Sequence, residues 1–256
     1  MRLAMNVSAL LTVLTLASAV SIIALILLGL RKALQTPPWT ARDRDKVMSA
    51  FTIALIGWFL AATVSAWLGA YRADPGTMPT IQYALLTPII IGAWLIWRSP
   101  TVGLIIDAMP QQWLVGVQVF RVLGGTFLVL YAMGKMPGVF AWPAGVGDML
   151  VGVLAGVIAA AYARAPRVNP DLVMWWNILG LTDLIIAVAT GIASSPSRIQ
   201  VTAFDQPNVL ITLFPLVLVP AFLVPLWILL HIASLTKLRR RAATANKPHG
   251  AAISHM

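Results

Sequence analysis

The sequence predicts an all-α integral membrane protein, a bundle of seven transmembrane helices with the N-terminus outside and the C-terminus in the cytoplasm. Of its 256 residues, 59% are hydrophobic and only 10% are charged, whereas a soluble domain carries about 25% charged residues. Uncharged stretches longer than the roughly 20 residues that cross a bilayer as a helix occupy 3–30, 47–71, 75–97 and 206–236. The alternating strands of a membrane barrel are absent from the sequence, so helices must satisfy the backbone hydrogen bonds.

The hydropathy pattern places the spans at 7–30, 47–70, 79–97, 112–133, 144–163, 172–193 and 209–235. The first apolar stretch is too long for a signal peptide and no clear cleavage site follows it, so we expect a retained helix. The apolar segment 101–111 is too short to span and is expected to lie along the inner surface. The transmembrane domain is predicted to cover 1–236, and 237–256 to form a basic, disordered cytoplasmic tail.

Lys and Arg are distributed unequally between the two sides that seven alternating spans define. One side carries thirteen of them: Arg31, Lys32, Arg42, Arg44, Lys46, Arg98, Arg164, Arg167, Lys237, Arg239, Arg240, Arg241 and Lys247. The other side carries four: Arg2, Arg72, Lys135 and Arg198. Because cytoplasmic loops collect Lys and Arg, the side with thirteen is expected to face the cytoplasm. The net charge of +10 then indicates contact with the anionic lipid bilayer rather than nucleic acid.

Four ionisable residues fall within predicted spans: Arg121, Asp148, Asp183 and His231. Such residues are costly in hydrocarbon and mark functional sites by default. The predicted boundaries place Arg121 and Asp183 near the midplane and Asp148 just within the outer end of the fifth helix. His231 falls near the inner end of the seventh helix, so the sequence predicts a cluster of three charges with His231 apart.

Polar and small residues share helical faces with these charges. On the fourth helix, Gln118, Arg121, Gly125 and Ala132 align at helical spacing, and on the sixth, Asn177 aligns with Asp183. The pattern G-x-x-D-x7-G occurs at 145–156 and again at 180–191. It is either the remnant of an inverted repeat, which is common in transporters, or a chance match between glycine-rich helices. Small-residue stripes favour close packing of helices four to six.

The charges have two interpretations. Arg121 and Asp183 could form a structural ion pair, with hydrogen bonds from Gln118 and Asn177, or they could bind a polar group of a ligand. A lone histidine near an interface is typical of a solvated or hydrogen-bonded residue. A haem site commonly needs a second histidine, and His249 and His255 lie in the tail. With no cysteine, no glutamate and no metal-ligand spacing, the sequence predicts no cofactor and no metal, and favours no enzymatic activity.

Several segments resemble a group of uncharacterised multi-pass membrane proteins of bacteria. They are QVFRVLGG at 118–125, PGVFAWPAGVGD at 137–148, NILGLTDL at 177–184 and the segment 219–231. The resemblance covers about the C-terminal half of the chain. It implies a location in the bacterial inner membrane, but it implies no activity and no role for any residue.

The function that the sequence favours is binding or transport of a small molecule, anionic or amphipathic, at a polar site between helices four and seven. The residues expected to bind it are Arg121, Asp148, Asp183, Gln118, Asn177 and His231. A cavity opening outward would be lined by the three charged residues and part of the seventh helix. The alternative is a non-catalytic accessory or sensor subunit, whose buried charges are structural and whose basic face binds a membrane protein partner. A lipid-modifying enzyme using the two aspartates lacks an evident nucleophile or metal.

Overall fold

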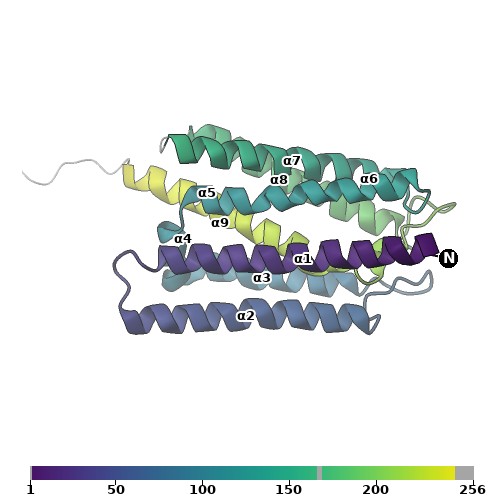
Figure 1. Ribbon diagram of the computed structural model, residues 1–256, viewed down its shortest axis with the longest axis horizontal. Helices are drawn as coiled ribbons and strands as arrows, with labels where there is room; N and C mark the ends of the chain where they lie inside the picture. Colours follow the sequence, from purple (N-terminus) through teal and green to yellow (C-terminus); the bar gives the residue numbers. More distant parts are fainter. Residues whose placement is uncertain (1, 166–168, 246–256) are drawn as a thin grey trace, which may run out of the picture.

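The computed structural model describes residues 2–165 and 169–245, and within them every regular element is a helix. Seven of the helices are long and apolar enough to cross a membrane, which confirms the predicted number of spans. The long helices lie nearly parallel along one axis (Figure 1). The sidedness of the bundle remains a prediction, so its two ends are named here by their residues. The basic end contains 34–40 and 99–110, and the loop end contains 68–80, 133–137 and 195–218.

The first three spans are single helices, the fourth is composite, and the seventh begins with a π-helical turn. In chain order, the elements are α1 (Arg2–Ala33), α2 (Ala41–Trp67), α3 (Ile81–Arg98), α4 (Pro100–Ala108), α5 (Gln111–Gly116), the 3₁₀ helix η1 (Val117–Gly124), α6 (Gly125–Ala132), α7 (Gly138–Arg164), α8 (Pro170–Ser194), η2 (Leu210–Thr212), the π-helix η3 (Val219–Leu223) and α9 (Val224–Ala245).

Local sequence signals fix several helix starts at the basic end. Thr40 caps α2, because its side chain accepts a hydrogen bond from the backbone N–H of Asp43 at 3.2 Å. Ser99 and Asn169 cap α4 and α8 in the same way, and each is followed by a proline at the first helical position. A capping side chain satisfies a free N–H, and proline there has no N–H to leave unpaired.

Three predicted spans have different bounds in the structure. The second begins at Ala41 rather than at 47, directly after its cap Thr40. The fifth begins at Gly138 rather than at 144, because the helix tolerates Pro143 near its start. The seventh spans Val219–Thr244 rather than 209–235. The apolar residues before it form turns and the short η2, since hydropathy alone does not distinguish a buried loop from a helix.

The predicted boundary between membrane domain and tail falls inside α9. Residues 237–245 of the expected disordered tail are helical, as the helix-forming Leu, Ala and Arg in this stretch permit. The remainder of the predicted tail, 246–256, lies outside the described residues, as does Arg167.

α9 is the central helix of the bundle. In Figure 1, α7 and α8 lie on one side of the bundle and α2 on the other, with α9 between them. Of the span Val219–Thr244, 56% is buried inside the protein, compared with 11% for the spans of α2 and α3. The polar residues on α9 therefore lie where the other helices converge, and α2 and α3 present apolar surfaces suited to lipid.

Candidate functional site

Arg121 lies at the centre of a buried cluster of charges. Its side chain is fully buried, with 0% exposure. Its Nε donates a hydrogen bond to Oδ1 of Asp148 at 2.8 Å, and one terminal nitrogen donates to Oδ2 of Asp183. The ion pair that the sequence predicted between Arg121 and Asp183 is therefore present, and Asp148 forms a second one.

The other terminal nitrogen of Arg121 has three acceptors around it. They are Oε1 of Gln118 at 3.5 Å, the backbone oxygen of Gly180 at 3.3 Å and Nε2 of His231 at 3.1 Å. The expectation that His231 stands apart was wrong. The displaced seventh span puts His231 near the middle of its helix, level with Arg121. We define the central cluster as Arg121, Asp148, Asp183 and His231.

The partners of His231 fix its tautomer. Its Nδ1 lies 2.9 Å from Oδ1 of Asn177, whose Nδ2 donates to Val173 O at 2.7 Å and to Ser234 Oγ at 2.9 Å. With the amide oriented in this way, Nδ1 of His231 carries the proton, and Nε2 accepts from Arg121. The imidazole is then neutral and adds no charge to the central cluster.

The backbone around Arg121 departs from an α-helix. Residues 117–124 form a 3₁₀ helix in the middle of the fourth span, a feature that often marks a hinge or local strain. Its buried residues Gln118, Arg121 and Gly124 follow a three-residue period, Val117 is buried beside them, and Phe127 and Leu130 continue the spacing into α6. The face predicted from α-helical spacing was therefore wrong at Gly125 and Ala132, because side chains three apart eclipse one another in a 3₁₀ helix.

Three glycines make room for side chains of the central cluster. A Cβ atom at Gly124 would overlap the side chain of Asp148, one at Gly147 the carboxylate of Asp183, and one at Gly180 the ring of His231. The sequence pattern identified Gly180 but missed Gly124 and Gly147. The two glycines that open the G-x-x-D repeat are not equivalent, since Gly145 lies against Leu128 rather than against a histidine.

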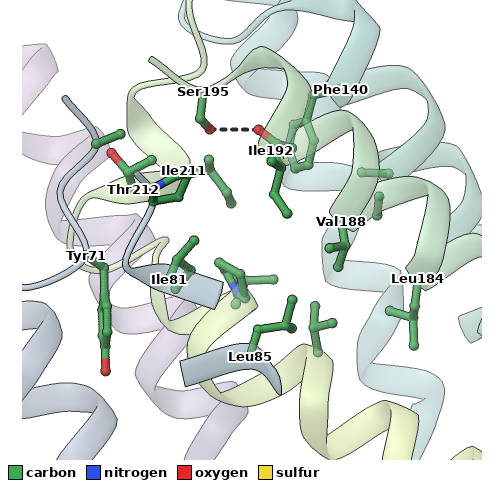
Figure 2. A pocket seen from close by; sticks show the side chains of 18 of the residues that line it. Tyr71, Ile81, Leu85, Phe140, Leu184, Val188, Ile192, Ser195, Ile211 and Thr212 are labelled. Atoms are coloured by element: carbon green, nitrogen blue, oxygen red, sulfur yellow. Dashed lines mark hydrogen bonds between the residues drawn. The ribbon is translucent and has the colours of Figure 1, made fainter. Parts of the chain in front are cut away.

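Two cavities meet at Asp148. The first, cavity A, has a volume of about 70 Å³ and lies between α3, α7, α8 and η3. Figure 2 shows Leu184, Val188 and Ile192 facing this space from α8, opposite Ile81 and Leu85. The second, cavity B, has about 50 Å³ and is lined by α1, η1, α6 and η3.

The predicted outward cavity thus differs in its lining. Asp148 and the start of the seventh span line cavity A as expected, but Arg121, Asp183 and His231 line neither cavity. Gly124, Gly147 and Gly180 allow the helices to approach closely around the guanidinium of Arg121, so neither cavity extends to it. Asp148 is the one member of the central cluster that the cavities reach.

A second polar cluster lies at the basic end. Sequence reasoning assigned Lys237 and Arg240 to a disordered tail and Asp107 to a segment along the inner surface. Lys237 is buried, with 1% exposure, and its Nζ donates to the backbone oxygens of Ile106 and Asp107 at 2.9 and 2.6 Å. Arg240 forms a more exposed ion pair with Asp107 at 2.7 Å. We call Asp107, Lys237 and Arg240 the basic-end clasp, because they join the end of α4 to α9.

Within 2–165 and 169–245, no group of three or more His, Cys, Asp or Glu side chains is placed to hold a metal ion. No curated protein and no solved structure matches the chain. A family described as a domain of unknown function, DUF8737, matches residues 78–239. This region runs from the start of the third span to α9, includes the whole central cluster and leaves out α1 and α2. Since the match covers more than half of the sequence, the chain belongs to the DUF8737 family.

Proposed function

We propose that this protein binds or transports a small molecule within the bacterial inner membrane, at a site where cavity A meets the central cluster. The observation that carries the proposal is the position of Asp148. One of its carboxylate oxygens holds Arg121, and the same side chain lines both cavities. A ligand can reach a buried charge that borders a cavity, whereas it cannot reach a charge enclosed by packed side chains.

The lining of cavity A gives a route to this carboxylate. Tyr71, Ser197 and Thr212 belong to the loop end, and Val188 and Ala187 continue the lining along α8 toward Asp148. A small molecule entering at the loop end would therefore pass an apolar wall before it meets a charge. Binding sites commonly combine an apolar lining with a few polar groups that fix orientation.

The polar network around the cluster is also incompletely satisfied. Nε2 of Gln118 and Oε1 of Gln111 are buried and have no hydrogen-bond partner among the described residues. A purely structural network is expected to pair nearly all such atoms. Neither side chain lines cavity A or cavity B, so these atoms mark incomplete pairing beside the cluster and do not contact the proposed ligand.

Thiol accessibility tests the proposal in this cysteine-free chain. In lipid nanodiscs, Ala187→Cys in cavity A should react with a charged thiol reagent. Two controls should react far more slowly: Ala155→Cys, at a buried position on α7 outside the cavities, and Ile185→Cys, at an exposed apolar position on α8. If Ala187→Cys is as unreactive as Ala155→Cys, the interior is sealed and the proposal fails.

That outcome would favour the second candidate, an accessory or sensor subunit. The complete burial of Arg121 supports it, because a sealed guanidinium can be purely structural. The basic end would then bind a partner protein. Native mass measurement after mild extraction would show a second chain in this case and a retained small mass in the first.

The proposed orientation places the loop end outside and the basic end in the cytoplasm, following the asymmetry of Lys and Arg. A reporter active only in the cytoplasm should be active when fused after Met256 and inactive when inserted at Gly76, in the loop after α2. The reverse pattern would overturn the orientation. Equal activity at both sites would contradict an odd number of spans between Gly76 and the C-terminal fusion.

A further inference from the structure

The charges of the central cluster do not balance within the described residues. Arg121 supplies one positive charge, Asp148 and Asp183 supply two carboxylates, and His231 is held as the neutral tautomer. With both acids ionised, the cluster carries one excess negative charge in the middle of the bundle. An uncompensated charge is costly in this environment, so something must balance it.

We propose that the ligand is a small organic cation with an apolar body, and that its ammonium group binds at Asp148 in exchange for one proton. This inference rests on the proposed function, because it uses cavity A as the binding site. When the cavity is empty, a proton on one of the two carboxyls balances the cluster. When an ammonium ion enters, that proton leaves and the cluster remains neutral.

The donors around cavity A argue against an anionic ligand. The hydroxyl of Ser195 donates to the backbone oxygen of Gly191 at 2.7 Å, and that of Thr212 to Val209 at 2.8 Å. The guanidinium of Arg121 is fully buried and directed at the protein groups described above. Among the described residues, the lining of cavity A includes no Lys, Arg or His. A carboxylate or phosphate would therefore meet the repelling charge of Asp148 and no cationic side chain, and the lining adds only the neutral hydroxyls of Tyr71 and Ser197 as further donors.

Asp148 can receive a cation. Its Oδ1 accepts from Arg121, and across the described part of the chain no hydrogen bond to its Oδ2 is recorded. The charged groups that face it are Arg121 from η1 and, beyond the guanidinium, Asp183 from α8, with neutral His231 on α9. The side chains that α1, α3 and α6 contribute to the two cavities are uncharged. Among the residues that the structure describes, the one other titratable group on the lining is Tyr71, in the loop after α2.

The walls select for a compact apolar body. Ile81, Leu85, Leu184 and Val188 surround cavity A, and its volume of about 70 Å³ exceeds the ~10–15 Å³ that one water needs. A short alkyl chain fits such a space better than a sugar or a nucleotide, whose polar groups would lack partners.

The test compares short-chain probes of similar shape and different charge, and adds a bulkier ammonium ion. The purified protein in detergent is mixed with n-butylammonium, cyclohexylammonium, n-butanol or n-butyrate, and its unfolding temperature is measured. We expect the two ammonium ions to raise the midpoint, and butanol and butyrate to leave it unchanged. In weakly buffered solution, ammonium binding should release up to one proton per chain. The apparent affinity should rise by up to about tenfold per pH unit while proton and ligand compete.

Three variants separate the possible outcomes. Asp148→Asn should abolish both the stabilisation and the proton release. Ala187→Leu should fill cavity A and abolish binding while it keeps every charge. Asp205→Asn, which removes an exposed acid at the loop end, should bind like the wild type.

Each contrary result has its own meaning. If butyrate binds and Ala187→Leu abolishes that binding, cavity A is the binding site but the ligand is not a cation. Ammonium binding without proton release, or undiminished in Asp148→Asn, would overturn the exchange. If neither ammonium ion binds while Ala187→Cys reacts, the ligand class is wrong. If Ala187→Cys is also inert, the proposed function fails with it.

Discussion

The central cluster and the basic-end clasp each include residues of α9, and they differ in charge and in surroundings. The central cluster joins His231 to Arg121 and two aspartates, one acid more than Arg121 can balance, and Asp148 lines both cavities. The basic-end clasp joins Lys237 and Arg240 to the end of α4, where the helix dipole and Asp107 supply negative charge. The ion pair between Arg240 and Asp107 is partly exposed, and the remaining positive charge, on Lys237, is buried against two backbone oxygens.

A buried charge whose partners are complete within the protein can be structural, whereas one that lacks a partner is a candidate for ligand binding. Lys237 caps carbonyl oxygens that α4 would otherwise leave unpaired, so the clasp is complete without any ligand. In the central cluster, Arg121 can balance only one of the two acids. The clasp also borders an open cavity, lined by Asp107, Arg240, Arg241 and Thr244, so the completeness of the partners around the buried charge, rather than burial or adjacent volume, separates the structural cluster from the candidate site.

The largest effect is expected from removing the guanidinium. Arg121→Gln leaves two carboxylates without their partner, and breaking a buried ion pair costs about 3–5 kcal/mol. Combining it with Asp148→Asn and Asp183→Asn should restore much of the stability, because no charge is then left unpaired. Thermal unfolding in detergent measures both. If the triple variant is as unstable as Arg121→Gln, the ion pairs do not account for the loss.

A smaller effect is expected where a glycine admits the histidine. In Gly180→Ala, the new methyl group would overlap the ring of His231, and overpacking of this kind costs about 1–3 kcal/mol. The matched control is Gly57→Ala on α2, where a Cβ would meet nothing within 4 Å. Replacing an open helical glycine should be neutral or stabilising by up to ~1 kcal/mol. Equal effects at the two glycines would contradict the close approach at Gly180.

The clasp is expected to show one effect of similar size and the smallest effect of all. Lys237→Met keeps the length of the side chain but removes two hydrogen bonds, each with a net contribution of about 0.5–1.5 kcal/mol, which together cost about 1–3 kcal/mol. Asp107→Asn breaks only the exposed pair with Arg240 and should cost about 0–1 kcal/mol. Neither variant should change ligand binding at cavity A. A loss of binding in Lys237→Met would show that the two clusters are coupled through α9.

Much of the fold follows from the sequence, because apolar stretches of sufficient length determine seven spans, four of them predicted from stretches without any charged residue. The pairing of Arg121 with Asp183 was also predictable, since a buried charge needs a partner. The place of His231 was not. The apolar residues 209–218 have the hydropathy of a span but form turns, and this shifted the predicted helix away from the cluster.

Two other features could not be predicted from sequence patterns, because they depend on contacts between segments that are far apart in the chain. The 3₁₀ helix at 117–124 depends on how α7 packs against it, as in the close contact of Gly152 with Val122, and not on local propensity. Lys237 reads as a tail residue because its charge ends an apolar run. Its burial depends on carbonyl oxygens of α4, far away in the sequence.

The most direct test of the excess acid in the central cluster compares unfolding of Asp148→Asn, Asp183→Asn and the double variant. We expect each single variant to unfold close to the wild-type temperature or above it, because one carboxylate still pairs with Arg121. The double variant should lose about 3–5 kcal/mol, since the guanidinium is then buried without a counter-charge. If each single variant is already as unstable as the double, both carboxylates are required as counter-charges, and the excess charge on which the proposed ligand rests does not exist.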